Sequence, residues 1–444
     1  MWAILEGDCG FSLWQHCVMV FGAKAAVWAY NRVGDAVIFL FRVLFFGISF
    51  HYVDDYGGIE PELLADSAFE AFFEFSQLLG FKTKISKQQP PASRQIMLGI
   101  DVHVTDSEFV TAVTKNRKKR MLEEIKEYVD KQRIVPKQAQ QLAGKSIFTN
   151  ASTFGALGAA ALRPLYRRAS YGGTKLDTDI EAALHMLGYL LRNAPPRSSS
   201  LALPTSEAPI LYADAFYTCR GATRKASQLS VDDLTDPHAT SGWGVVVISG
   251  KEAWHFGGSV PHEVFTALKK KKTYIFLLEV VAQCMGTWLM ARELQPHFWA
   301  FVDNVGAEHA LRKGFSRDRD ANAIISLFWA AAAHCTTRPW FERVPSAAQL
   351  ADGVSRNDDT AAQCIGSKRL DFDFDEIWGI IIDMVSAGGL ADTSHRDSLL
   401  AAVNRQRARF NLELLDVNGG TLERVERLRW AKTPPVPPRG LPTT

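Results

Sequence analysis

The chain has 444 residues, of which 47% are hydrophobic and 22% are charged, and its formal net charge is +2 at pH 7. This ordinary globular composition excludes the collagen-like, fully disordered and disulfide-stapled classes of protein. At about 100 to 200 residues per domain, the length predicts two to four domains, each large enough to bury a core.

The sequence predicts neither a membrane-spanning nor a secreted protein. Its most apolar stretch, residues 36–50, is too short to cross a bilayer and contains Arg42. The first ten residues lack the basic and apolar regions of a signal peptide. Six cysteines without a C-x-x-C pair indicate neither a zinc ribbon nor a disulfide framework. We therefore expect an intracellular protein, cytoplasmic or nuclear, with no membrane partner.

The first ninety residues predict two helices and a hairpin. Hydrophobic spacing indicates helices at 25–41 and 61–79, and aromatic and β-branched residues indicate a buried strand at 45–52. Asp54 and Asp55 then lie at a turn before a return strand. Two adjacent carboxylates at a hairpin tip can hold divalent cations, although aspartate is also common at turns for conformational reasons alone.

This region resembles the reverse transcriptases of retroelements. In that family a Y-x-D-D hairpin, here YVDD at residues 52–55, follows an F-G-x-x-x-A helix, here FGAKAA beginning at Phe21. Residues 79–87 resemble the lysine-bearing motif behind the polymerase palm, and residues 97–100 resemble the primer-grip hairpin.

The resemblance implies a partial palm over residues 1–105 and RNA-directed DNA polymerase activity on a template-primer. It makes Asp54 and Asp55 catalytic metal ligands and places Lys87 against nucleic acid. The family's palm needs a third carboxylate and fingers further upstream than this chain extends, and Asp8 is too close to the F-G helix to serve. The resemblance therefore implies an N-terminally truncated polymerase or an incomplete gene model.

The next segment, residues 106–192, is predicted to be a helical thumb or connection. Residues 111–150 contain ten Lys or Arg against four Asp or Glu. Basic runs such as this bind phosphates without reading sequence, although most charge runs are only solvated. The predicted nucleic-acid contacts are Lys115, Arg117, Lys118, Lys119 and Arg120, and in a later run Lys269, Lys270, Lys271 and Lys272. The Pro- and Ser-rich residues 193–209 are predicted to be an exposed linker.

Four carboxylates in residues 210–360 predict a metal site. Asp214 ends a predicted strand, Glu279 lies in a helix, Asp303 ends another strand and Asp352 lies in a further helix. Carboxylate oxygens are the ligands that Mg²⁺ prefers, and no His or Cys cluster points to zinc. Each acid alone is more often a surface residue.

The order of these acids resembles the ribonuclease H domain of retroelement reverse transcriptases. Ser241–Gly244 resembles a small-residue strand of that fold, and residues 344–356 resemble its V-P…A-D-x-x-S-R ending. The resemblance implies endonucleolytic hydrolysis of RNA in an RNA–DNA hybrid by Asp214, Glu279, Asp303 and Asp352. It also implies two Mg²⁺ ions per site, with Mn²⁺ as a substitute. The histidine that many members carry before the last aspartate is absent here, which predicts slow turnover.

The expected fold class is therefore α+β and α/β multidomain: a partial reverse-transcriptase palm, a helical thumb or connection, and a ribonuclease H-like mixed sheet with flanking helices. Residues 361–444 are predicted to be a C-terminal extension with a disordered end, and their acidic run 370–376 to be solvated. The alternative function is that of a non-catalytic nucleic-acid-binding remnant of a retroelement. The sequence fixes no oligomeric state.

Overall fold

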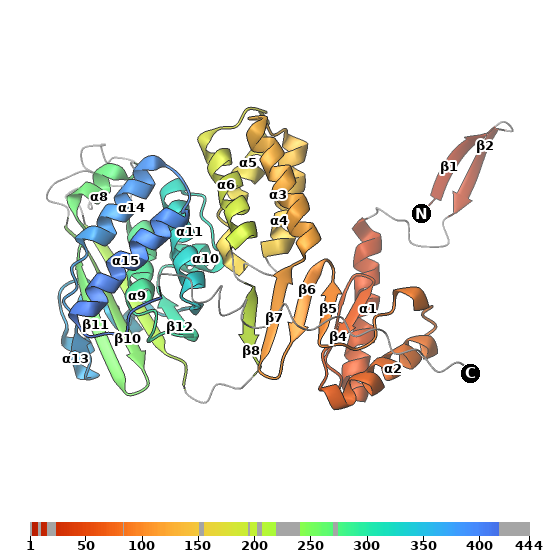
Figure 1. The fold of residues 1–444 in the computed structure, drawn as a ribbon, viewed down its shortest axis with the longest axis horizontal. Helices are drawn as coiled ribbons and strands as arrows, with labels where there is room; N and C mark the ends of the chain where they lie inside the picture. The colour runs from red at the N-terminus through yellow and green to blue at the C-terminus, as the bar shows by residue number, and fades with distance from the viewer. Residues whose placement is uncertain are drawn as a thin grey trace. The chain divides into compact units, whose positions relative to one another are not determined.

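The computed structural model describes residues 2–7, 10–15, 24–82, 84–150, 155–193, 196–201, 207–218, 240–269 and 274–416. The fold is mixed α+β, with one large mixed sheet and many helices, as the sequence predicts (Figure 1). The described residues divide into two compact units within strand β5 (Arg94–Met97): those up to Gln95 belong to unit 1 and those from Ile96 belong to unit 2. In the described residues, no helix is long and apolar enough to cross a membrane.

Unit 1 contains the predicted hairpin between two helices. Its elements are β1 (Trp2–Gly7), β2 (Gly10–Gln15), α1 (Lys24–Phe45), β3 (Ser49–Tyr52), β4 (Asp55–Gly58) and α2 (Glu62–Leu78). Strand β3 pairs antiparallel with β4, and α1 packs on α2 through Phe41 and Phe75. The strand predicted at 45–52 begins only at Ser49, because α1 continues to Phe45 and ends where Phe46 adopts a left-handed φ of 58°.

The first part of unit 2 joins a small sheet to a helical bundle. The strand order is β5-β6-β7-β8, with β6 (Ile100–Val104), β7 (Glu108–Val113) and β8 (Arg197–Ser200). The helices are α3 (Lys115–Asp130), α4 (Pro136–Thr149), α5 (Leu162–Tyr171) and α6 (Thr178–Asn193). They bury a core that includes Leu142, Leu165 and Leu184. These four helices lie within the segment 106–192, apart from the last residue of α6, and this segment also contains strand β7.

Strand β8 lies inside the segment predicted to be an exposed linker, so that prediction is wrong for residues 197–200. The Ser-rich stretch pairs antiparallel with β7, with Ser198 opposite Val110. An edge strand forms ladder hydrogen bonds on one side only and tolerates polar side chains. The sequence of β8 therefore lacks the apolar side chains by which a strand is predicted.

The second part of unit 2 is built on a six-stranded mixed sheet with the order β13-β12-β9-β10-β11-β14. Its strands are β9 (Ile210–Thr218), β10 (Thr240–Ser249), β11 (Glu252–Ser259), β12 (His297–Val302), β13 (Arg338–Arg343) and β14 (Lys368–Arg369). Strands β9, β10 and β11 are antiparallel, whereas β12 runs parallel to both β9 and β13.

Helices cover both faces of this sheet. They are α8 (His262–Ala267), α9 (Ile275–Leu289), α10 (Val305–Lys313), α11 (Arg319–His334), α12 (Ala351–Ser355), α13 (Thr360–Cys364), α14 (Asp375–Ala387) and α15 (Thr393–Arg409). Helix α9 is buried from Leu277 to Leu289 and shares a core with Leu211 and Ala213 of β9. Because successive side chains of a strand alternate between faces, Tyr212 and Asp214 lie on the other face, with α12.

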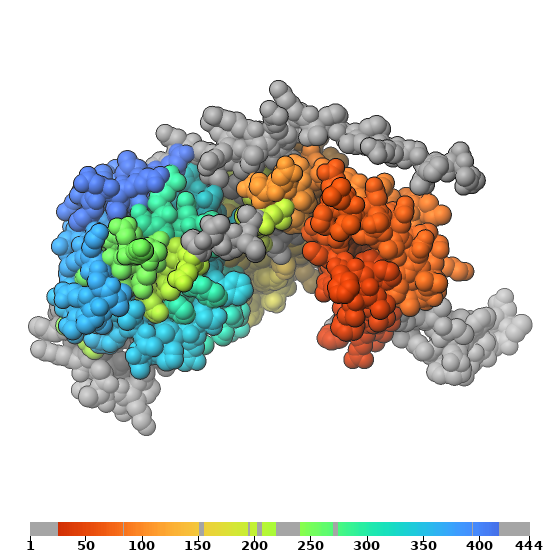
Figure 2. Space-filling view, turned by 90° about the horizontal axis from the view of Figure 1, so that it is seen from below, coloured from red at the N-terminus to blue at the C-terminus, as the bar shows by residue number. Residues whose placement is uncertain are grey.

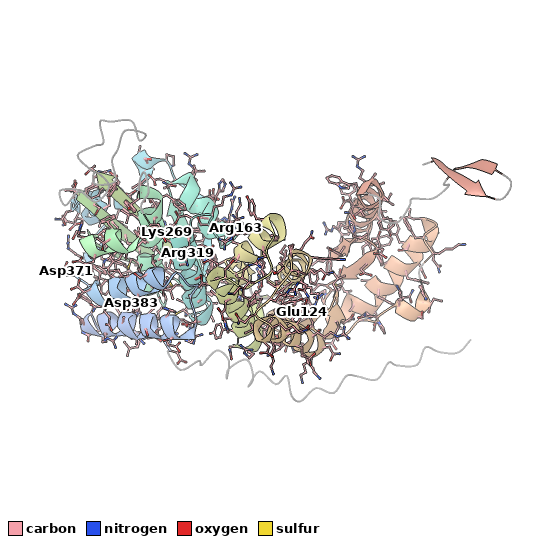
Figure 3. The ribbon with its side chains drawn as sticks, turned by 90° about the horizontal axis from the view of Figure 1, so that it is seen from above. Glu124, Arg163, Lys269, Arg319, Asp371 and Asp383 are labelled. Atoms are coloured by element: carbon pink, nitrogen blue, oxygen red, sulfur yellow. The ribbon has the colours of Figure 1, made fainter. Side chains whose placement is uncertain are left out.

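Residues 361–416 pack onto the same core. The acidic side chains of the run 370–376 are exposed, but the prediction of a solvated segment is wrong for two apolar residues of the run, which are buried. Leu370 and Phe372 are buried, while Asp371 between them points to the surface (Figure 3). This period of two is the pattern of an extended segment with one face in a core. Helices α14 and α15 follow and bury Trp378 and Val403. Figure 2 shows the C-terminal residues, in blue, against green and cyan residues from earlier in unit 2.

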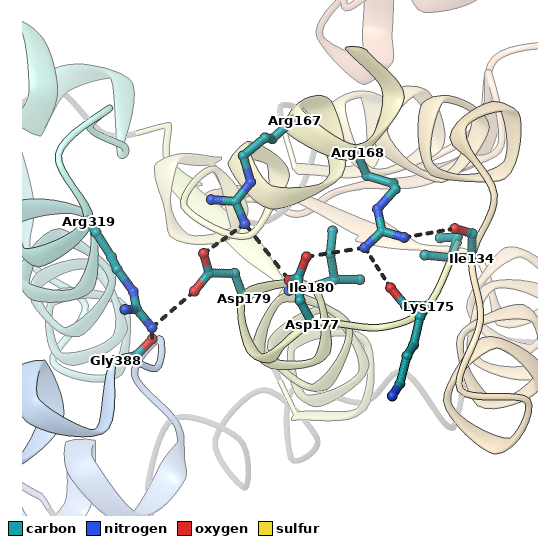
Figure 4. A network of polar contacts seen from close by, with 9 residues as sticks. All are labelled: Ile134, Arg167, Arg168, Lys175, Asp177, Asp179, Ile180, Arg319 and Gly388. Carbon is teal, nitrogen blue, oxygen red and sulfur yellow. Dashed lines mark hydrogen bonds and ion pairs between the residues drawn. The ribbon is translucent and has the colours of Figure 1, made fainter. Parts of the chain in front are cut away.

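A polar network joins the helical part of unit 2 to the sheet part (Figure 4). Asp179 at the start of α6 accepts from Arg167 at 2.7 Å and pairs with Arg319 of α11 at 3.1 Å. Arg319 also donates to the carbonyl oxygen of Gly388 at 2.7 Å. Nearby, Trp329 of α11 packs against both hydrophobic cores. The two parts therefore share apolar as well as charged contacts.

Candidate metal centre

Three of the four predicted carboxylates of the sheet converge. Oxygens of Asp214, Glu279 and Asp303 all lie within 4.8 Å of one another. Asp214 lies within β9, and Asp303 follows the end of the parallel neighbour β12, whose Phe301 is in register with Tyr212. Glu279 reaches the same place from α9. Three segments distant in sequence thus bring three acids to one point.

The cluster is buried and incompletely satisfied. The residues Asp214 and Glu279 are each only 3% exposed. In the part of the chain that the structure describes, Glu279 Oε2 and Asp303 Oδ1 are buried without a hydrogen-bond donor. A buried carboxylate oxygen without a donor is costly unless a proton or a cation neutralises it. The donor set, oxygen from carboxylates alone, fits a hard divalent cation.

The electrostatics agree with this reading. Burial raises the pKa of Asp214 to about 6, although the Ser355 hydroxyl lowers it, and the charges of Asp303 and Asp352 raise it further. Burial, and then the charges of Asp214 and Asp303, raise the pKa of Glu279 to about 10. Without a cation, Glu279 therefore holds its proton at neutral pH, and a bound cation would take the place of that proton.

Two serines hold the carboxylates in position. Ser355 Oγ donates to Asp214 Oδ2 at 2.8 Å, and Ser346 Oγ donates to Asp303 Oδ2 at 3.0 Å. Gln349 Nε2 donates to the Ala213 carbonyl at 3.1 Å and ties the loop before α12 to β9. Sequence reasoning missed Ser346 and Gln349. Both lie in the segment where many ribonuclease H domains carry a histidine, and that position could have indicated that the segment contacts the site.

Glycine allows α12 to approach the sheet closely. A Cβ atom added at Gly244 of β10 would lie 2.4 Å from the Ser355 nitrogen, and one added at Gly242 would lie 2.4 Å from the Ser355 carbonyl oxygen. Only residues without a side chain fit at these two positions. The Ser-Gly-Trp-Gly stretch thereby lets Ser355 reach Asp214.

The fourth predicted carboxylate, Asp352, lies beside the cluster and outside the converging group. Its Oδ1 accepts from Arg356 Nη2 at 3.0 Å and Nε at 3.2 Å. The Asp352 side chain is 49% exposed, and Arg356 also stacks over Phe216 at 5.2 Å. The Asp352 charge still raises the pKa of Asp214. Arg356 thus holds Asp352 at the rim of the cluster.

The other predicted carboxylates, Asp54 and Asp55, lie as expected at the β3–β4 hairpin. Asp54 is in the turn, Asp55 pairs with Tyr52, and both are exposed. In the described residues, neither belongs to a group of three potential metal ligands. Phe21 and the start of the F-G motif lie outside the described residues, as does Asp8.

The predicted nucleic-acid contacts differ in exposure. Arg117 stacks on Phe148 at 4.8 Å and donates to the Leu98 carbonyl at 3.3 Å. Lys118 Nζ donates to the Arg192 carbonyl at 3.2 Å. The exposed residues are Lys87, Lys115, Lys119, Arg120 and Lys269, the last visible in Figure 3. Lys270, Lys271 and Lys272 lie outside the described residues.

The chain has structural neighbours at low sequence identity. No protein-family model and no curated protein matches the sequence. A foamy viral protease-reverse transcriptase in complex with dsDNA matches with a TM-score of 0.35 and 12% identity, over 77% of this chain and 63% of that chain. The same kind of protein in complex with RNA/DNA hybrid matches with a TM-score of 0.31 and 11% identity, over 82% and 64%. The chain thus spans less than two thirds of the length of these structures.

Proposed function

We propose that unit 2 is a nuclease that hydrolyses the RNA strand of RNA–DNA hybrids with Mg²⁺, or with Mn²⁺ as a substitute. The convergence of Asp214, Glu279 and Asp303 carries this proposal. Buried acids with raised pKa values, here Asp214 and Glu279, destabilise a fold when ionised and are typical of functional sites. The choice of an RNA–DNA hybrid comes from the sequence resemblance to retroelement ribonuclease H.

In this proposal Asp214, Glu279 and Asp303 hold the cation, and Asp352 completes the site for a second one. Divalent cations held there would supply the activation of a water molecule and the stabilisation of charge on the leaving oxygen. The chain's own groups orient the ligands: Ser355 fixes Asp214, and Ser346 fixes Asp303. Burial keeps the local dielectric constant low and strengthens each of these interactions.

The exposed lysines and arginines of α3 would supply contacts to the phosphate backbone. Lys115, Lys119 and Arg120 are exposed at the start of this helix, where the macrodipole also favours an anion. Such contacts give affinity without sequence preference, which suits an enzyme that acts on any hybrid.

The deciding experiment is cleavage of an end-labelled RNA–DNA hybrid by the full chain with Mg²⁺ and with Mn²⁺. We expect cleavage that Asp303→Asn reduces by at least about a hundredfold, because it removes a metal ligand. The matched control is Asp55→Asn, an exposed aspartate of unit 1, which should cleave like the original chain. No cleavage with either cation, with hybrid binding retained, would favour the non-catalytic nucleic-acid-binding remnant instead.

A second candidate is RNA-directed DNA synthesis on a template-primer. The observation that favours it is the β3–β4 hairpin, which presents Asp54 and Asp55 at an exposed turn. Primer extension by the same preparation, compared with Asp54→Asn, tests it. Extension that requires Asp54 would support polymerase activity, and extension that survives Asp54→Asn would point to a contaminant.

A further inference from the structure

The sheet face that carries the acid cluster continues into an aromatic surface. On this face, Trp299 of β12 lies opposite Trp340 of β13, and Phe301 lies opposite Glu342. Moving along β12, the order is His297, Trp299, Phe301 and then Asp303. At about 3.3 Å per residue, Trp299 is about 13 Å from Asp303 along the strand.

The two tryptophans form an exposed pair. Trp299 is 40% exposed and Trp340 is 64% exposed, and their rings meet edge to face at 6.0 Å. By contrast, Tyr212 and Phe301 in the next row stack on each other at 5.0 Å, and Tyr212 packs against the α12 core. Exposed tryptophan pairs are unusual on a sheet without a ligand, because burying them would be strongly favourable.

Positive charge lies at the far end of the tryptophan pair. Arg338 is in register with His297 and donates to Ser199 Oγ of β8 at 3.1 Å. Burial and the nearby charge of Arg197 lower the pKa of Arg338. The charge of Glu108 acts in the opposite sense and is a weaker influence on this pKa than the charge of Arg197. Two neighbouring guanidinium groups with a single nearby carboxylate complement an anion.

We infer that the β12–β13 face binds a single strand of nucleic acid, with bases stacked on Trp299 and Trp340 and a phosphate at Arg338. Aromatic side chains next to a basic group bind single strands because every base has a face that stacks and every nucleotide has a charged phosphate. The inference that this nucleic-acid strand leads away from the acid cluster rests on the proposed nuclease function. The binding itself does not require that function.

The test is fluorescence anisotropy of a labelled single-stranded oligonucleotide with the full chain in EDTA, so that cleavage plays no part. Trp340→Ala should weaken binding about tenfold, since each stacked base contributes about 1–3 kcal/mol. Trp340→Phe keeps an aromatic face and should bind within about threefold of the original chain. The matched control is Trp28→Ala, a 72% exposed tryptophan of α1 in unit 1, which should leave the affinity unchanged.

Binding that Trp340→Ala and Arg338→Ala leave unchanged, in variants with an unaltered melting temperature, would overturn the inference and leave this face to a protein partner. An equal loss in Trp28→Ala would do the same, because it would indicate nonspecific contact. If no variant cleaves hybrid but Trp340→Ala still weakens strand binding, the binding surface stands and the nuclease proposal fails. If the original chain cleaves hybrid but Trp340→Ala binds the single strand as well as the original chain does, the nuclease proposal stands and the binding surface fails.

Discussion

The chain carries two sets of carboxylates, which differ in exposure and in the number of potential metal ligands that converge. Asp54 and Asp55 are exposed at a hairpin turn, and no third ligand joins them in the described residues. The acids of the sheet are brought together from three segments, and two of them are almost fully buried. A sequence motif thus identifies acids that can bind a cation. Burial identifies the acids whose ionised form destabilises the fold unless a cation is bound.

Removal of one ligand should separate the two sets most strongly. We expect Asp303→Asn to lower the affinity for Mn²⁺ by at least about a hundredfold, because each buried ligand contributes a charge in a low-dielectric site. Titration of Mn²⁺ followed by calorimetry or electron paramagnetic resonance measures this directly. Asp55→Asn should change the same affinity less than twofold. Equal losses in the two variants would remove the distinction between the sets.

The tight packing around the cluster should also distinguish it from the hairpin. Gly244→Ala places a Cβ atom 2.4 Å from Ser355 backbone and should destabilise the protein by about 1–3 kcal/mol through overpacking. Gly58→Ala in β4 meets only the Ile48 carbonyl at 3.1 Å and should cost less. Chemical denaturation monitored by circular dichroism gives both values. A larger loss for Gly58→Ala would contradict the packing argument.

The raised pKa values predict how stability depends on pH. In the metal-free protein Asp214 and Glu279 bind protons more tightly than in the unfolded chain, so stability falls as pH rises above about 4 and continues to fall through the raised values near 6 and 10. Asp214→Asn removes one of these charges. At pH 8 without a cation it should raise the free energy of unfolding by about 1–2 kcal/mol.

Saturating Mg²⁺ provides the control for this effect. The cation should stabilise the original chain and reverse the order of the two proteins, because only the original chain retains all three ligands. Thermal melts at pH 5 and pH 8, with EDTA or Mg²⁺, measure the four conditions. A metal-free Asp214→Asn variant less stable than the original chain at pH 8 would show that the carboxylate is not strained.

The smallest expected effect concerns the rim of the cluster. Arg356→Ala frees Asp352 from its ion pair and removes a nearby positive charge, so Mn²⁺ should bind about threefold to tenfold more tightly. Arg405→Ala breaks a comparably exposed ion pair, with Glu376, and should have no effect on Mn²⁺ affinity. Weaker Mn²⁺ binding in Arg356→Ala would mean that Arg356 supports the site instead of competing with it.

Much of the fold was predictable because its signals are local. The hairpin, the basic helix and the strand and helix positions of the four acids follow from hydrophobic period and turn residues. The contacts that make the cluster a site depend on tertiary structure: the Ser346 hydroxyl at Asp303 comes from a loop forty-three positions away in sequence. No local pattern encodes such a contact. Asp352 was assigned to the cluster by sequence order, which carries no information about its ion pair with Arg356.

The position of the last helices has a consequence for how the protein is made. Strand β9 begins at Ile210, but Val403 and Leu415 belong to the same hydrophobic core. During synthesis the complete core cannot form until Leu415 has emerged from the ribosome. The apolar strands that are translated earlier lack part of their packing until then. Folding of this part of unit 2 therefore depends on a core whose members lie about 200 positions apart in sequence, and such separation slows folding.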